Sequence, residues 1–77
     1  MSKEKKIGIL FGTFDFLHKG HLNLFRQAKK KCDYLIVVVA RDKTVKKVKG
    51  KLPVHNESKR LNEIKKLKLI DHAILIF

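Results

Sequence analysis

The sequence predicts a small α/β domain built on a parallel sheet. Three apolar runs, residues 7–11, 34–40 and 73–77, are separated by stretches that contain helical periodicity. The second and third runs do not alternate polar with apolar residues, which is typical of strands buried on both faces of a parallel sheet. The order strand, helix, strand, loop, helix, strand therefore indicates the first half of a doubly wound α/β domain.

Two helices are predicted between the strands. The first spans residues 20–31, where apolar side chains recur at every third position. The second spans residues 57–67, follows the N-capping residue Asn56 and repeats the same apolar spacing. The segment 42–51 is rich in lysine and is expected to be a loop. With the strands in the order 3-2-1, right-handed crossovers place both helices on the same face of the sheet.

This arrangement leaves the other face of the sheet without a helix. The second and third strands are nonetheless apolar on both faces, so the uncovered face would form a large exposed apolar patch with open edges. We expect this face to be covered, either by further residues of a longer protein or by a second copy of the chain. Association, as a homodimer or with a covering partner, is therefore expected.

Length and charge limit the classes of function. The 77 residues form at most one domain. No apolar run reaches the ~18 residues needed to span a bilayer, and the charged N-terminus lacks the apolar core of a signal peptide, so no membrane association and a cytoplasmic location are expected. A formal net charge of +12 attracts polyanions. However, sixteen of the nineteen basic residues are lysines and no aromatic residues interleave with them, which argues against nucleic acid as the partner.

The most informative segment runs from Gly12 to His21 and reads Gly-Thr-Phe-Asp-Phe-Leu-His-Lys-Gly-His. It begins where the first strand ends and finishes inside the first turn of the predicted helix. Unpaired backbone N–H groups and the positive end of the helix dipole favour phosphate at such a point. His18 and His21, with Gly20 between them, add side-chain donors there. The segment therefore predicts a phosphate-binding site.

The same segment resembles the signature of the HxGH nucleotidyltransferases, the cytidylyltransferase-like superfamily. The similarity extends over roughly residues 6–77, and its pattern is closest to glycerol-3-phosphate cytidylyltransferases and archaeal FAD synthetases. It implies a Rossmann-like, three-layer fold of the HUP type, of which residues 1–77 would be a single truncated domain that comprises the N-terminal half.

This resemblance also implies a reaction. The chain would bind a nucleoside triphosphate, CTP or ATP, and transfer the nucleotidyl group to a phosphorylated alcohol with release of pyrophosphate. The alternative is a half domain that binds nucleotide or associates with itself without catalytic activity. Mg²⁺ is expected to be held by the phosphates of the triphosphate, with no metal ligands from the protein.

Each residue of the motif then receives a role, and so do three basic residues beyond it. His18 and His21 are the expected catalytic residues and would donate hydrogen bonds to the phosphates. The expected nucleotide-binding residues are Gly12, Thr13, Phe14, Asp15, Lys19, Gly20, Lys49, Lys51 and Arg60. Asp15 would orient either the loop or the acceptor. Lys46 and Lys47 are alternatives to the two lysines that follow them.

Two departures from the family's pattern bear on these expectations. Cys32 stands where relatives carry a glycine at the end of the first helix, so a different helix cap is expected there. The later strands, helices and serine/threonine-rich motif that complete the family's nucleotide pocket have no counterpart in these 77 residues. The choice between CTP and ATP and the identity of the acceptor therefore stay open.

Overall fold

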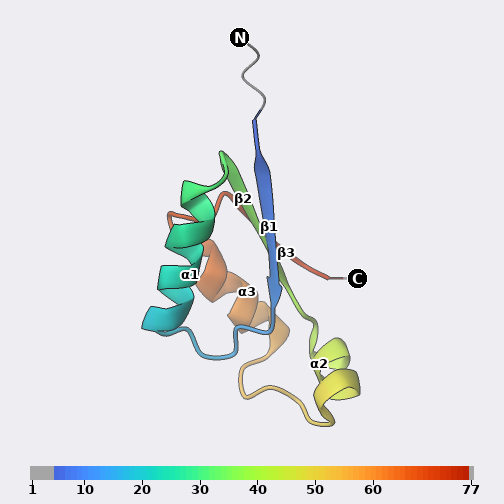
Figure 1. The fold of residues 1–77 in the computed structure, drawn as a ribbon. Helices are drawn as coiled ribbons and strands as arrows, with labels where there is room; N and C mark the ends of the chain where they lie inside the picture. Colours follow the sequence, from blue (N-terminus) through green and yellow to red (C-terminus); the bar gives the residue numbers. More distant parts are fainter. Residues whose placement is uncertain (1–4, 77) are drawn as a thin grey trace.

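A computed structural model describes residues 5–76. Three strands, β1 (Ile7–Gly12), β2 (Tyr34–Val39) and β3 (His72–Leu75), form one parallel sheet in the order β1-β2-β3 (Figure 1). The helices are α1 (Lys19–Lys30), α2 (Asp42–Lys49) and α3 (Glu57–Lys65). The predicted α/β class and strand order are confirmed, although Phe77, the predicted end of the third strand, lies outside the described residues. No helix within residues 5–76 has the length and apolar character needed to cross a membrane.

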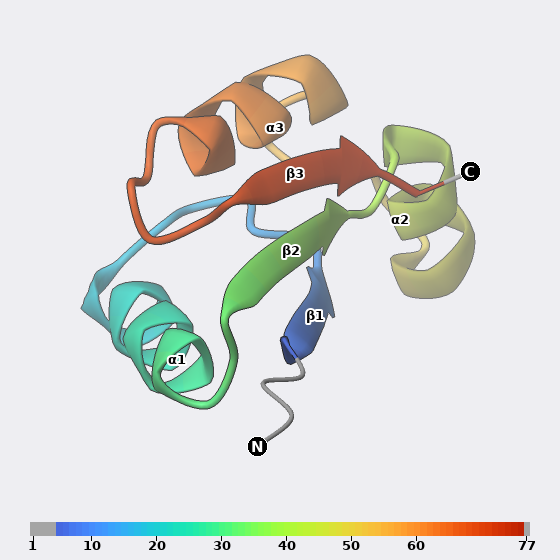
Figure 2. The ribbon, with the colours of Figure 1, turned by 90° about the horizontal axis from the view of Figure 1, so that it is seen from above.

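Helices α1 and α3 cover the same face of the sheet, as predicted. Phe25 of α1 and Ile64 of α3 have no exposed area and join one core cluster with Leu35 and Val37 of β2. Alternate residues of a strand point to the same face, so every second residue of β2 enters this core. Seen from above in Figure 2, α1 and α3 lie beside the sheet on the same side, with α2 apart from both.

The opposite face of the sheet is apolar and, in the part of the chain that the structure describes, is uncovered along β1, although Val38 of β2 is only 7% exposed. Ile7, Ile9 and Phe11 on β1 expose 63%, 52% and 68% of their surface. The parallel register continues this face through Val38 to Ile74, since Phe11 pairs with Val38 and Val38 with Ile74. The structure therefore contains the predicted exposed apolar face. A partner that covers this face stays a prediction.

The expectation of a loop over residues 42–51 is wrong, because Asp42–Lys49 forms helix α2. Val45 anchors this helix with 4% of its surface exposed. Gly50 ends it in the left-handed conformation, at φ 81°, with its N–H donating to the Lys46 carbonyl at 2.8 Å. Figure 1 shows α2 beyond the carboxyl ends of β1 and β2. The helix therefore carries part of the lysine-rich segment to the end of the sheet where the motif lies.

The C-terminus of α1 is capped without a left-handed residue, as Cys32 suggested. Lys31 lies at φ −99° and donates its N–H to the Ala28 carbonyl at 3.0 Å. Cys32 is half-buried against β1, where a Cβ added to Gly8 would lie 3.0 Å from its sulfur. The cysteine thus packs as a small apolar group at the helix end.

Candidate functional site

An open groove lies at the carboxyl end of β1, between the start of α1 and the end of α2, with a volume of about 760 Å³. The carboxyl ends of parallel strands are the usual position of ligand sites in such sheets. Eight of the eleven expected site residues line the groove: Gly12, Thr13, Phe14, Asp15, His18, His21, Lys49 and Lys51. The remaining three, Lys19, Gly20 and Arg60, lie outside its lining.

His18 and His21 cap the start of α1 together. His18 is the N-cap residue, and its Nδ1 accepts the N–H of Gly20 at 3.0 Å. The Nδ1 of His21 accepts the N–H of His18 at 3.4 Å, and the two ring centroids are 4.1 Å apart. These bonds satisfy backbone donors that the first turn of a helix otherwise leaves unpaired. Each ring uses Nδ1 in the cap, which leaves its Nε2 for a ligand.

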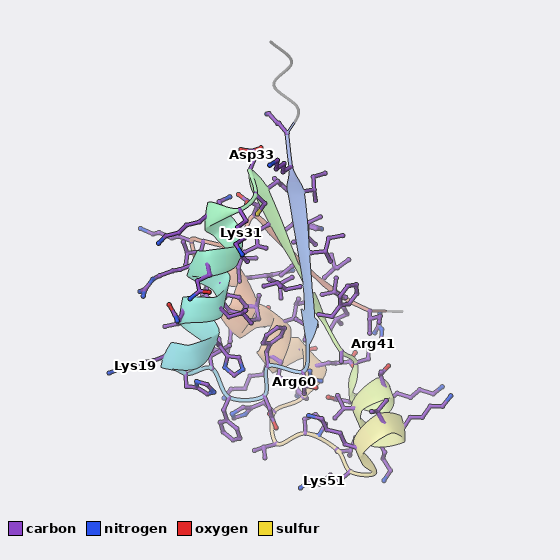
Figure 3. All side chains as sticks on the ribbon, viewed as in Figure 1. Lys19, Lys31, Asp33, Arg41, Lys51 and Arg60 are labelled. Atoms are coloured by element: carbon purple, nitrogen blue, oxygen red, sulfur yellow. The ribbon has the colours of Figure 1, made fainter. Side chains whose placement is uncertain are left out.

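Gly20 makes room for this cap, while Lys19 lies apart from the groove. A Cβ added to Gly20 would lie 2.7 Å from Cε1 and 3.0 Å from Nδ1 of His18. Any larger residue at position 20 would displace the His18 ring. Lys19 projects away from Lys51 and Arg60 (Figure 3) and lines a separate surface hollow with Gly20. The structure therefore gives Gly20 a packing role and places Lys19 outside the groove.

The surroundings of His21 disfavour a positive charge on its imidazole. Burial lowers the pKa of His21 below its ordinary value, and the neighbouring His18 lowers it further. The Phe14 ring packs edge-on against His21, with centroids 5.6 Å apart and planes at 72°. This ring is therefore held in place as a hydrogen-bonding group whose neutral form its surroundings favour.

Phe14 anchors the motif in the hydrophobic core. Its side chain is 8% exposed and packs against Phe25, with centroids 5.5 Å apart. Its backbone lies in the left-handed region at φ 51°, a conformation that costs of order ~1–3 kcal/mol in a bulky residue. Gly12 accommodates the ring, since a Cβ there would lie 2.6 Å from Cζ of Phe14. In this structure, the group that approaches Gly12 closely is the Phe14 ring.

Asp15 orients a loop. Its two carboxylate oxygens accept the N–H groups of Val54 and His55 at 2.7 and 2.8 Å. Burial raises the pKa of Asp15, but these two backbone hydrogen bonds more than offset it, so the net shift is downward. Of the two roles left open by the sequence, the structure shows the loop role. Asp15 thus ties the segment before α3 to the motif.

Arg60 is a buried structural residue, and its expected part in nucleotide binding stays a prediction. Only 1% of its surface is exposed. It donates to the carbonyls of Thr13, Ala40 and His55 at 2.8, 2.7 and 2.9 Å, and to the carboxylate of Asp42 at 2.7 Å. These partners occupy four of its five N–H groups. Arg60 therefore joins the motif, the end of β2, the start of α2 and the segment before α3.

Sequence reasoning missed the acidic and basic residues that fasten α2. Arg41 donates to the carbonyl of Ile76 at 2.7 Å and to the carboxylate of Glu57 at 3.0 Å. The carboxylate of Asp42, the residue after Arg41, forms an ion pair with the guanidinium of Arg60. The available signal was the sudden change from an apolar strand to Arg41-Asp42, because charged residues at a strand's carboxyl end often hold neighbouring loops.

The lysines that reach the groove are Lys49 and Lys51, at the end of α2 and just beyond it. Lys46 and Lys47 are absent from its lining. Within residues 5–76, no cluster of three or more histidine, cysteine or acidic side chains could hold a metal ion. The groove therefore presents imidazoles and ammonium groups, a donor set that suits an anion rather than a bare cation.

A second, apolar hollow of about 250 Å³ adjoins the groove between α2 and the bare face of the sheet. Its walls come mainly from the side chains of Phe11, Val38, Val45, Val48 and Ile76. The two spaces share five lining residues, so a ligand could extend from one into the other: Phe11, Gly12, Thr13, Val45 and Lys49.

Comparison with known proteins agrees with this geometry. The family model described as cytidylyltransferase-like matches residues 9–76. A protein named FAD synthase from Thermococcus sibiricus (strain DSM 12597 / MM 739) is 42% identical over 76 residues, which cover 97% of this chain and 51% of the relative. The crystal structure of the lipopolysaccharide core biosynthesis protein from Thermoplasma volcanium GSS1 superposes with a TM-score of 0.88 at 42% identity, over 96% of this chain and 60% of that one.

These matches also show how much of each relative corresponds to this chain. The chain spans about half the length of the curated relative that it matches. The Rossmann-like character of the sheet, expected from the sequence, is confirmed by the superposition. Because the family model matches residues 9–76, well over half of the sequence, the chain belongs to the cytidylyltransferase-like family.

Proposed function

We propose that the chain binds a nucleoside triphosphate with Mg²⁺ and acts in nucleotidyl transfer to a phosphorylated alcohol with release of pyrophosphate. The observation that carries this proposal is the paired histidine cap at the start of α1. His18 and His21 keep Nε2 available there, in a groove that also contains Lys49 and Lys51. Helix dipole, imidazoles and ammonium groups all favour the phosphates of one ligand.

Such a site would act mainly by positioning the ligand and stabilising negative charge. The acceptor oxygen attacks the α-phosphorus in line, and pyrophosphate leaves. His18 and His21 would donate to the phosphate oxygens as charge develops on them, and Lys49 and Lys51 would stabilise the departing pyrophosphate. Mg²⁺ would enter on the triphosphate and neutralise part of its charge.

The relative named FAD synthase suggests which substrates to test first. Its name favours ATP over CTP as the nucleotide and FMN as the phosphorylated acceptor. The apolar hollow beside the groove supports an acceptor with an apolar portion, because Lys49 stands at the junction of the two spaces. A phosphate near Lys49 and a ring system in the hollow would satisfy both surfaces.

The alternative is a half domain that binds nucleotide without turnover. Two observations support it: the chain spans about half of its curated relative, and one sheet face is uncovered in residues 5–76. Measurement of pyrophosphate release separates the two candidates. Pairs of ATP or CTP with FMN, glycerol phosphate or a sugar phosphate should be screened with this chain and with any longer version of it.

The binding site itself is tested by calorimetry with MgATP and MgCTP. His18→Asn and His21→Gln remove the imidazoles but keep acceptors that can cap the helix, because asparagine is a good N-cap and glutamine suits the third helical position. We expect each variant to bind roughly tenfold more weakly, the loss of a hydrogen bond to a charged group. Lys19→Ala is the matched control and should bind normally. Unchanged affinity in both histidine variants would overturn the site.

A further inference from the structure

We propose that His18 and His21 bind the triphosphate as neutral imidazoles, each through Nε2–H, and that protonation of either ring breaks the cap of α1 and weakens binding. The identity of the ligand rests on the proposed function. The protonation state of the two rings does not, because it follows from contacts within the chain.

The first step is the position of the ring protons. A neutral imidazole has one N–H and one acceptor nitrogen, whereas an imidazolium has two N–H groups and no acceptor. Nδ1 of His18 accepts the N–H of Gly20, and Nδ1 of His21 accepts the N–H of His18. A proton on either Nδ1 would face a backbone N–H. Both rings must therefore carry their single proton on Nε2 while the cap is intact.

The second step is that the rings have little room to adjust. The two centroids are 4.1 Å apart, and the Phe14 ring packs edge-on against His21. The His18 ring occupies the space beside Gly20 that a Cβ would fill. If a ring were protonated and kept its place, its Nδ1–H would point at the backbone N–H that Nδ1 now accepts. The protonated ring must therefore rotate out of the cap.

The third step is the charge around the pair. The positive end of the α1 dipole lies at both rings, and Lys49 and Lys51 line the same groove from α2 and the segment after it. The acidic residue in the lining is Asp15, whose carboxylate already accepts two backbone N–H groups. Burial also lowers the pKa of His21. These surroundings oppose a positive charge on the His21 imidazole.

The lysines and the histidines therefore have different roles in binding the triphosphate. The lysines and Mg²⁺ supply the positive charge, and the two histidines supply directional donors fixed before the ligand arrives. Simple electrostatics predicts that acid strengthens anion binding, because histidines become cations. The cap predicts the opposite, since protonation removes the geometry on which both donors depend.

Nitrogen-15 NMR of the ligand-free chain at pH 7.5 tests the protonation state directly. We expect His18 and His21 each to show one tautomer, with the proton on Nε2. His72, which is exposed and lies away from the groove, serves as the internal reference and should show a mixture. A proton on Nδ1 of either capping histidine, or a tautomer mixture like that of His72, would overturn the inference.

Calorimetry with MgATP at pH 7.5 and 5.5 tests the consequence. Affinity should fall on acidification by about two- to tenfold, where tenfold is the full loss of a hydrogen bond to a charged group and partial protonation gives less. The double variant His18→Asn/His21→Gln should bind weakly at both values with a much smaller change, which corrects for protonation of the ligand. Stronger binding by the unmodified chain at pH 5.5 would overturn the inference. No binding at either pH would instead overturn the proposed function, and the NMR result would still decide the tautomer.

Discussion

Asp42 and Glu57 cap each other's helices. The N–H of Asp42 donates to Oε1 of Glu57 at 3.0 Å, and the N–H of Glu57 donates to Oδ2 of Asp42 at 3.2 Å. Each is the first residue of its helix, so the exchange fixes the starts of α2 and α3 together. Arg41 and Arg60 each bind one of the two carboxylates. The helix that carries Lys49 is thus fastened to the core through α3.

Arg60→Met should destabilise the domain severely. The substitution leaves the Asp42 carboxylate and three backbone carbonyls without the donor that they share. Removing one partner of a buried ion pair costs about 3–5 kcal/mol, a large fraction of the stability of so small a domain. Urea denaturation followed by circular dichroism measures the loss. Lys59→Met, an exposed neighbour on α3, should stay within about 0.5 kcal/mol, and similar curves for the two variants would contradict the assigned role.

Asp71→Asn should reduce the sensitivity of the fold to acid. The Lys29 ammonium and the N–H of Leu35 bind the Asp71 carboxylate and lower its pKa. A carboxyl with a lowered pKa in the folded state stabilises that state above its unfolded pKa of about 3.9 and loses this contribution as pH falls toward the folded value. Urea midpoints measured from pH 7 to pH 2 should therefore fall less below about pH 4 in the variant. Parallel profiles would exclude this contribution.

Gly20→Ala should separate ligand binding from stability. Alanine improves helix propensity by up to about 1 kcal/mol, but its Cβ would displace the His18 ring and weaken a cap worth about the same. The free energy of unfolding should therefore change by less than about 1 kcal/mol, while MgATP affinity falls roughly tenfold. Thermal denaturation and calorimetry on the same sample give both values. Normal affinity would show that the His18 ring can keep its position beside an alanine, and would contradict the predicted displacement.

Lys49 and Lys51 should contribute to nucleotide affinity more than Lys46 and Lys47. Only the first pair lines the groove. Lys49→Ala and Lys51→Ala should each weaken MgATP binding about two- to fivefold at low salt, the range of exposed charge pairs. High salt should remove most of the difference, since exposed charges are screened. Lys46→Ala and Lys47→Ala are matched controls from the same helix. Equal losses in all four variants would indicate a general charge effect.

The bare sheet face should drive self-association. Phe11 and Ile9 are more than half exposed on a face whose paired positions in β2 and β3 carry no acidic, lysine or arginine side chain. Light scattering at increasing protein concentration should show a mass above that of one chain. Phe11→Lys should shift the species toward monomer, because it places a charge on the most exposed part of the apolar face. A monodisperse monomer at high concentration would contradict this expectation.

The sequence predicted the strands, both core helices and the groove's histidines because local patterns determine them. Continuous apolar runs marked β2 and β3, and three-residue spacing marked α1 and α3. Helix α2 was missed because Val45 and Val48 are its only apolar side chains, too few to reveal a period. Gly50 was the available signal, since a glycine after lysines is typical of a helix end.

The roles of Arg60, Phe14 and Asp15 could not be read in the same way. Phe14 and Asp15 lie in the motif and Arg60 was expected at the same site, yet each makes its main contacts within the protein. The burial of Arg60 depends on four segments that meet only after folding. Sequence patterns identify the residue types near a site, but tertiary contacts decide which of them face the ligand.

The left-handed backbone of Phe14 bears on the thermodynamics of ligand capture. The Phe14 ring lies in the core, the Asp15 carboxylate holds the segment before α3, and the Thr13 carbonyl accepts from Arg60. Three consecutive residues are thus immobilised by contacts independent of any ligand. Their conformational entropy is already lost on folding, so nucleotide capture need not order this turn. Nucleotide binding should consequently lose little conformational entropy in this turn. The backbone strain at Phe14 is the energetic cost of forming the turn before the ligand binds.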